Sequence, residues 1–244
     1  MTGTLINVVT VLCGAAAGAA LGARFPERWR QGVMDGIGLV TVVIGMSLAL
    51  QTKNVIVVLG ALLPGALLGE WWRLDDRLRR FGDWVEARGG RLERWFARGQ
   101  PAAPGRMSKA FVTASLVFCV GPLTIVGSLQ DGLRGDFRLL AVKSTLDGFA
   151  AMAFASSLGI GVALAAVTVL LYQGALTLSA HALNAVLTDA MVREMSAVGG
   201  VMILGLGLVL LEIKHVRVAN MLPALALAPF VQALAELWQR YIHV

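Results

Sequence analysis

Long apolar runs dominate this sequence and limit what it can fold into. A helix that spans a bilayer needs roughly 20 mostly apolar residues, and the 244-residue chain holds about seven or eight such runs, joined mostly by short loops. Hydrophobic residues make up 57% of the chain and its mean hydropathy is +0.73, well outside the range of soluble globular domains. We therefore predict an all-α, polytopic transmembrane helix bundle, with residues 1–244 forming a single transmembrane domain.

The expected spans follow from where the apolar runs begin and end. Leu139 to Ala180 is one run of about 42 residues, which would be about 63 Å long as a single helix, so we expect a break at Ser156–Gly161. The eight expected spans are about 4–21, 34–50, 55–69, 110–128, the two halves of 139–180, 196–211 and 218–238. Seven spans are the alternative.

Residues 73–109 differ from the rest because they are basic and amphipathic. Leu74, Leu78, Phe81 and Val85 recur at helical spacing with charges between them, so we expect this segment and its linker to lie along the anionic inner leaflet. With eight spans, 15 of the 21 lysines and arginines fall on the side of this segment, five fall on the other side and Lys143 lies within a span. This bias predicts a cytoplasmic segment and two external termini. It also explains the net charge of +6 without a nucleic-acid partner.

Polar and charged residues interrupt the apolar pattern between Gly121 and Gly148. Such groups are costly at membrane depth unless they pair or line a polar cavity, so they mark a candidate functional site. The candidates for binding a substrate or ion are Ser128, Gln130, Asp131, Lys143, Ser144 and Asp147. Lys143 and Asp147 are four residues apart and share a helix face. An internal ion pair, a contact for solute or protons, and an interfacial loop all agree with that spacing.

Glycine and proline positions indicate where helices break or pack closely. Proline removes a backbone hydrogen bond, and freed backbone groups at mid-membrane are tolerated only beside protein or a wet cavity. The candidates for helix breaks or hinges are Gly121, Pro122, Pro64 and Pro223. The first span carries a ridge of small residues that lets another helix approach closely. The ridge consists of Gly14, Gly18 and Gly22.

Two stretches of the chain, 34–72 and 196–238, are similar to each other. The aligned pairs are Gly38 with Gly200, Gly45 with Gly207, and Pro64 with Pro223. The stretches form the second and third spans and the seventh and eighth, so an odd shift of five spans would insert the copies in opposite directions. Inverted repeats with interrupted helices recur in secondary transporters. One span more or fewer would make the repeat parallel.

Several local motifs resemble those of a known family. They are GTLIN, GLVTVVIGMSLAL, ASLVFCVGPLTIVGSLQDGL, KSTLDG, ASSLGIGV, LLYQGALTL, AVGGVMILGLGL and NMLPAL. With these motifs the chain resembles the YqgA-like, or YdfK-like, family of bacterial inner-membrane proteins, catalogued as a domain of unknown function. The resemblance covers nearly the whole chain and is weakest over 73–109. It implies a multi-pass protein of the bacterial inner membrane and brings no established activity.

The sequence contains no sign of an enzyme, a cofactor or a metal site. It has no G-x-S-x-G elbow, no H-E-x-x-H pair, no phosphate-binding loop and no carboxylate cluster within one span. Its histidines, His181, His215 and His243, lack partners at metal-ligand spacing. We therefore expect no enzymatic activity and no cofactor.

The expected function is that of a small-solute or ion transporter or channel with a polar centre between the fourth and fifth spans. The alternative is a non-transporting membrane scaffold or sensor, in which 73–109 reads the lipid surface and the polar residues hold helices together. The expected partners are the lipid bilayer and a small solute or ion. The glycine ridges are also compatible with a homo-oligomer.

Overall fold

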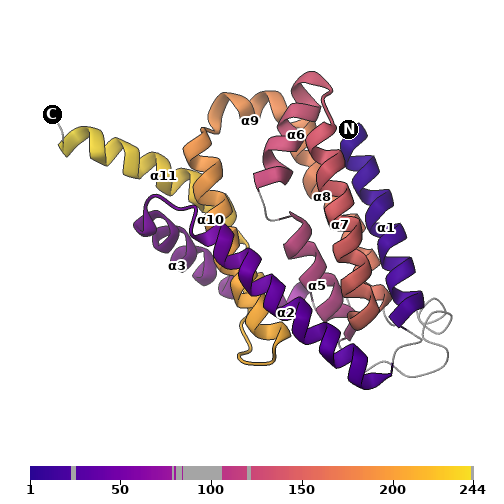
Figure 1. Ribbon diagram of the computed structural model, residues 1–244. Coiled ribbons are helices and arrows are strands. Elements are labelled where there is room, and N and C mark those ends of the chain that lie inside the picture. The colour runs from indigo at the N-terminus through magenta and orange to yellow at the C-terminus, as the bar shows by residue number, and fades with distance from the viewer. Residues whose placement is uncertain (23–25, 79, 81–83, 85–105, 120–121, 243–244) are drawn as a thin grey trace.

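The computed structural model describes residues 1–22, 26–78, 80, 84, 106–119 and 122–242 (Figure 1). Within these ranges all regular secondary structure is helical, which confirms the predicted all-α class. The helices are α1 (Thr2–Gly22), α2 (Glu27–Ala49), α3 (Val55–Trp72), α5 (Arg106–Cys119), α6 (Pro122–Arg134), α7 (Arg138–Leu158), α8 (Ala165–Leu178), α9 (Ala180–Val186), α10 (Asp189–Leu210) and α11 (Pro223–Ile242), with 3-10 turns η1 (Ile160–Leu164) and η2 (Val218–Met221). Gly121 and most of 73–109 lie outside the described residues.

The helices coincide with the predicted spans. Seven described helices are long and apolar enough to cross a membrane: α1, α2, α3, α7, α8 with η1, α10, and α11 with η2. The pair α5 and α6 passes the same test together, with a bend of 62° between its halves. The predicted break in 139–180 is confirmed at Gly159, whose φ of +88° ends α7.

The packing direction of α7 decides whether α5 and α6 cross the membrane together. Along α1, Gly14, Gly18 and Gly22 contact successively later residues of α7, so α1 and α7 lie side by side and parallel. If the chain turned back between α5 and α6, α7 would run antiparallel to α1. We therefore infer that the bent pair is one span and that the fold has eight.

The glycine ridge of α1 is confirmed as a close helix contact. A Cβ atom on Gly14, Gly18 or Gly22 would overlap a backbone carbonyl oxygen of α7. The three oxygens belong to Gly148, Met152 and Ser156. Small residues at a four-residue spacing are the usual means by which membrane helices approach this closely.

The helices group into two bundles (Figure 1). The first contains α1 and α5 to α8, and the second contains α2, α3, α10 and α11; each surrounds its own apolar core. Leu116 of α5 packs into the second core, Leu210 of α10 packs into the first, and α2 packs on α7 with Met34 and Ile37 against the first core. These contacts of α2, α5, α7 and α10 form the seam between the bundles. Helix α9 connects α8 to α10 across one end of the molecule (Figure 1).

The second bundle contains the two similar stretches, packed antiparallel. Gly207 of α10 lies against the carbonyl oxygen of Gly38 of α2, and Gly200 of α10 lies against that of Gly45 of α2. Gly38 therefore contacts the residue aligned with Gly45, and Gly45 contacts the residue aligned with Gly38. Between α3 and α11, Gly65 lies against Ala224. These two residues directly follow the aligned prolines, Pro64 and Pro223. A two-fold arrangement produces this exchange of partners, because residue i contacts the equivalent of j while j contacts the equivalent of i.

Some helix boundaries differ from the prediction. Helices α2 and α10 begin at Glu27 and Asp189, before their apolar windows, because polar first turns continue the helix outside the apolar region. Thr188 caps α10 by accepting a hydrogen bond from the N–H of Met191 at 3.2 Å. Pro223 lies where the last span changes from η2 to α11: it is the first residue of α11, a position where its missing N–H is not needed. Pro64 does lie inside α3, as predicted.

Candidate functional site

A buried carboxylate on α7, Asp147, is the centre of a polar cluster in the first bundle. Lys143, one turn earlier on the same helix, forms an ion pair with Asp147 Oδ2. Asn7 of α1 donates from Nδ2 to the same oxygen at 2.9 Å. All three side chains are buried. An ammonium group and an amide therefore converge on one carboxylate oxygen.

Helix α8 extends the cluster toward the start of α1. Asn7 Nδ2 also donates to Gln173 Oε1 at 2.9 Å, and Gln173 Nε2 donates to Thr4 Oγ1 at 3.3 Å. Thr4 Oγ1 lies 3.4 Å from Thr177 Oγ1. We call this connected set the polar column; it consists of Thr4, Asn7, Lys143, Asp147, Gln173 and Thr177.

Asp131 of α6 lies beyond the Thr4 end of the polar column, against the first turn of α1. It accepts a hydrogen bond from the N–H of Gly3 at 3.1 Å, and its Oδ2 lies 3.0 Å from the Met1 amino group. The first N–H groups of a helix lack intrahelical partners, and a carboxylate there also interacts favourably with the helix dipole. Asp131 therefore caps α1 from a neighbouring helix.

Two buried polar atoms in this region have no hydrogen-bond partner among the residues that the structure describes. They are Asn7 Oδ1 and Ser128 Oγ, each on a side chain that is 0% exposed. A buried acceptor or hydroxyl without a partner costs about 1–3 kcal/mol. The site thus carries unmet hydrogen-bonding capacity beside its ion pair.

On α1, α7 and α8, the buried side chains change from polar to apolar one turn beyond the polar column. One turn beyond the polar column stand Val11 of α1, Ala151 of α7 and Val169 of α8, all at most 1% exposed. Phe118 of α5 and Phe154 of α7 follow, with ring centroids 6.2 Å apart. The polar column therefore begins near the first turn of α1 and ends against an apolar layer inside the bundle.

Comparison with known proteins places the chain in a family. Residues 2–233 match the family model described as Protein of unknown function (DUF554). The chain belongs to this family. It is 36% identical over 236 residues to the uncharacterized protein YqgA of Escherichia coli (strain K12), covering 97% of this chain and 98% of the relative. It is 29% identical over 235 residues to the uncharacterized membrane protein YdfK of Bacillus subtilis (strain 168), covering 95% of each. No solved structure matches it.

The predicted site residues of this DUF554 protein fall into different environments. Lys143 and Asp147 meet in the polar column, and Asp131 lies at its end against α1. Ser144 is fully buried but donates to the carbonyl oxygen of Leu140 on its own helix, at 2.6 Å. Gln130 is half-buried and belongs to none of the hydrogen bonds among the residues that the structure describes. Pro122 is the first residue of α6, so it marks the break below Ser128.

Four of the six residues of the polar column, Thr4, Asn7, Gln173 and Thr177, were not predicted as part of a site. The sequence suggests only that the amides of Asn7 and Gln173 face other helices, and Thr4 and Thr177 give no signal of their own. Thr4 and Asn7 are three residues apart, and Gln173 and Thr177 are four apart, so each pair lies on one helix face. That spacing of polar residues in the first and sixth spans is the signal that could have identified them.

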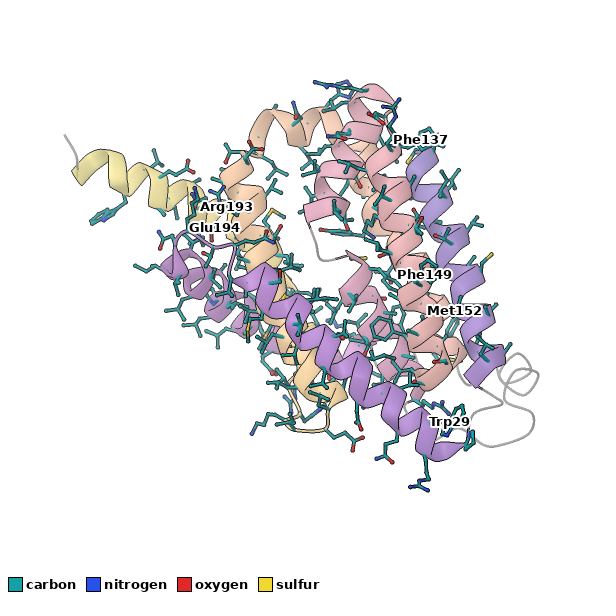
Figure 2. All side chains as sticks on the ribbon, in the orientation of Figure 1. Trp29, Phe137, Phe149, Met152, Arg193 and Glu194 are labelled. Atoms are coloured by element: carbon teal, nitrogen blue, oxygen red, sulfur yellow. The ribbon has the colours of Figure 1, made fainter. Side chains whose placement is uncertain are left out.

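A second buried carboxylate lies in the other bundle of this DUF554 protein. Glu194 of α10 is 1% exposed and accepts from Thr52 Oγ1 at 2.5 Å and from the N–H of Lys53 at 3.0 Å. These bonds tie the turn between α2 and α3 to α10. Figure 2 shows Glu194 across the molecule from Phe149 on α7, so Glu194 is separate from the polar column.

The chemistry available to the polar column is ionic and hydrogen-bonding. No three His, Cys, Asp or Glu side chains gather in a metal-binding group within the described ranges. The column holds one positive and one negative charge, several reorientable amide and hydroxyl groups, and an unpartnered acceptor. Such a set can exchange a proton, an ion or a hydrogen-bonding solute.

Proposed function

We propose that this protein moves a small solute or an ion across the bacterial inner membrane, with the polar column on its path. The observation that carries the proposal is the buried ion pair of Lys143 and Asp147 beside the unpartnered Asn7 Oδ1. Ionisable residues inside membrane proteins are costly, and they commonly mark ion or substrate pathways. The membrane location is supported by the spans and by the similarity to the uncharacterized membrane protein YdfK of Bacillus subtilis.

We also propose that the second bundle is an inverted repeat. The antiparallel packing of α2 on α10 and of α3 on α11 supports this, as does the exchange of glycine contacts. Antiparallel spans that align in sequence enter the membrane from opposite sides. In secondary transporters such repeats form the framework around a site near the midplane.

The proposed mechanism is alternating exposure of the polar column. In the present arrangement the apolar layer at Phe118 and Phe154 closes it on one side. Opening that side requires the first bundle to shift along the seam, where α2 and α10 of the second bundle contact α7 and α5 of the first. The break between α5 and α6, near Pro122, and Pro64 in α3 are the positions proposed to absorb the movement.

The test is the accessibility of buried positions to a small charged reagent. Ser144→Cys and Ser128→Cys are introduced separately in a background with Cys13→Ala and Cys119→Ala. Right-side-out and inside-out membrane vesicles are treated with a charged methanethiosulfonate reagent. Both positions are 0% exposed in the present arrangement, so we expect labelling only because the protein visits states that admit water.

The matched control is Ala151→Cys, which lies on the same helix as Ser144, is also 0% exposed and belongs to the apolar layer. It should remain unlabelled from both sides. If Ser144→Cys and Ser128→Cys are labelled no faster than Ala151→Cys in folded protein, the polar column is sealed and the transport proposal is wrong.

A membrane scaffold or sensor is the second candidate. One observation favours it: the Lys143 and Asp147 charges, and the donors of Asn7 and Gln173, are all bonded within the protein. A sealed structural cluster would have this property. The absence of labelling described above would therefore support the second candidate.

A further inference from the structure

The hydrogen bonds of the polar column have a direction: each runs from its donor either toward the Asp147 carboxylate or away from it along the amide chain. This direction suits an ionised Asp147. An ionised carboxylate can only accept hydrogen bonds. Lys143 Nζ and Asn7 Nδ2 both donate to Asp147 Oδ2. Asn7 Nδ2 also donates to Gln173 Oε1, whose own Nε2 donates to Thr4. The described arrangement therefore suits a deprotonated Asp147.

The same chain can also run in the reverse direction. An amide presents an oxygen and an NH2 group of nearly equal shape, so a half turn of the side chain exchanges acceptor and donor. After such a turn, Asn7 Oδ1 would accept from a protonated Asp147, and Gln173 Nε2 would donate to Asn7 Oδ1. Gln173 Oε1 would then accept from the Thr4 hydroxyl, which can donate as well as accept.

The reversal keeps the number of hydrogen bonds in the chain. The bonds Asp147–Asn7, Asn7–Gln173 and Gln173–Thr4 can each form in either direction. Thr177 lies outside this exchange: its hydroxyl donates to the carbonyl oxygen of Gln173 at 2.9 Å, so the Thr4–Thr177 contact is given up when Thr4 donates to Gln173. One amide atom of Asn7 stays without a partner in each state; in the described state it is Oδ1. Losing or gaining one proton at Asp147 therefore changes the direction of the chain without breaking it.

The surroundings of Asp147 favour a proton over other ions. A bound metal ion needs several oxygen ligands directed at it, whereas the groups that converge on Asp147 Oδ2 are the N–H donors of Lys143 and Asn7. An anion would be repelled by the carboxylate. A proton needs neither an oxygen cage nor a cavity.

Few other charged or titratable groups are available to Asp147. Lys143 is on its own helix, and Cys119 of α5 interacts electrostatically with both members of the pair. Asp131 of α6 is engaged by Gly3 at the first turn of α1. The remaining described groups on helices packed against α7 are Cys13 and the Met1 amino group of α1, Arg28 and Asp35 of α2, Arg106 and Lys109 of α5, and Arg134 of α6; η1 has none. Asp35 and Arg134 are exposed, and Arg106 donates to the Ser157 carbonyl oxygen.

We propose that Asp147 is a proton-binding site, that the Asn7–Gln173–Thr4 chain reverses its hydrogen bonds as the proton arrives and leaves, and that the proton is the coupling ion of this protein. The proton comes from water on one side and binds Asp147, which leaves the buried Lys143 ammonium group without its counter-charge and so favours release of the proton and return of the ion pair. It leaves to water on the other side, and the ion pair forms again. The role as coupling ion rests on the transport function proposed above; proton binding itself does not.

The first experiment is an infrared titration of the full protein reconstituted in phosphatidylethanolamine and phosphatidylglycerol bilayers. We expect the band of a protonated carboxyl group to grow as the pH falls, and part of it to be missing in Asp147→Asn. Amide bands of Asn and Gln side chains should change in parallel in the wild type, because the chain reverses. The control is Glu194→Gln, which removes a buried carboxyl group from the other bundle and should leave these linked changes intact.

The second experiment measures proton movement in liposomes of the same lipids that contain a pH-sensitive dye. A potassium diffusion potential drives proton entry, which we expect for wild type and Glu194→Gln and not for folded Asp147→Asn. An infrared titration that is identical in wild type and Asp147→Asn would overturn proton binding at this site. Proton entry unaffected by Asp147→Asn would overturn its role in coupling.

These results are distinguishable from a failure of the transport proposal. If Ser144→Cys is labelled while Asp147 shows no proton-linked change, transport stands and the coupling ion is not the proton. If Asp147 titrates while Ser144→Cys and Ser128→Cys stay unlabelled, the proton switch stands and transport is overturned.

Discussion

At the scale of single residues, the unusual feature of this protein is an ion pair buried within the bundle. Lys143 and Asp147 are 5% and 8% exposed. Breaking such a pair by removing one partner costs about 3–5 kcal/mol, because the other charge remains buried, whereas replacing both by apolar residues is often neutral or stabilising. This asymmetry separates a structural role of the pair from a functional one.

The corresponding prediction compares single and double variants. Lys143→Met should lower the free energy of unfolding by up to about 3–5 kcal/mol at a pH where Asp147 is ionised, and by less at low pH, where Asp147 takes up a proton. The double variant Lys143→Met/Asp147→Leu should recover wild-type stability within about 1–2 kcal/mol and yet lose proton movement. Thermal unfolding in detergent and the liposome assay measure the two effects. A double variant that is less stable than Lys143→Met would show that the pair is needed to hold the helices together.

The sequence could identify the members of this pair but not their surroundings. A four-residue spacing on one helix is visible in the sequence, so Lys143 and Asp147 could be placed on one face. Asn7 lies 140 residues from Asp147 along the chain, and it is Asn7 that joins Asp147 to Gln173 of α8, 166 residues from Asn7. Hydrophobic periodicity reports which face of a helix is apolar and carries no information on which helix will cover it.

At the scale of elements, the contact between α1 and α7 positions the polar column. Asn7 and Asp147 can bond only because the glycines farther along α1 let its backbone reach the α7 carbonyl oxygens. The sequence predicted a close approach from the four-residue spacing of glycines. It could not predict α7 as the partner, because small residues also line the contact between α2 and α10.

A substitution in this ridge should therefore disturb the whole site. Gly18→Leu should lower the free energy of unfolding by about 1–3 kcal/mol or more, because the added side chain meets the rigid carbonyl group of Met152 and cannot move aside. The matched control is Ala20→Leu, an exposed position on the same helix that should change stability little. Melting temperatures in detergent compare the two. Equal melting temperatures would contradict the tight contact.

At the scale of the whole molecule, the directions of the helices fit eight alternating spans. Helices α1 and α7 run parallel, while α2 with α10, and α3 with α11, run antiparallel. These relations agree with the predicted order of spans when α5 and α6 count as one. The length of the apolar runs was enough to predict every span. The bend in the fourth span could be suspected only from Gly121 and Pro122. Composition does not predict the angles at which helices cross or which helices pack into the same bundle.

The last prediction concerns the sides on which the turns lie. Lys53, Asp136 and Lys214 are exposed positions in the turns that follow α2, α6 and α10. With eight spans and external termini, Lys53→Cys and Asp136→Cys should react with a membrane-impermeant maleimide on intact cells, and Lys214→Cys should react only after the membrane is opened. The background lacks Cys13 and Cys119.

Each other pattern has a distinct meaning, because a turn changes sides with every span between it and the N-terminus. Reaction of Lys53→Cys and Lys214→Cys without Asp136→Cys would indicate seven spans, with α5 and α6 forming a re-entrant pair. It would contradict the parallel packing of α1 and α7 and would remove the inverted repeat. Reaction of Lys214→Cys alone would keep the eight spans but place the termini inside, so that the polar column would begin at the cytoplasmic side.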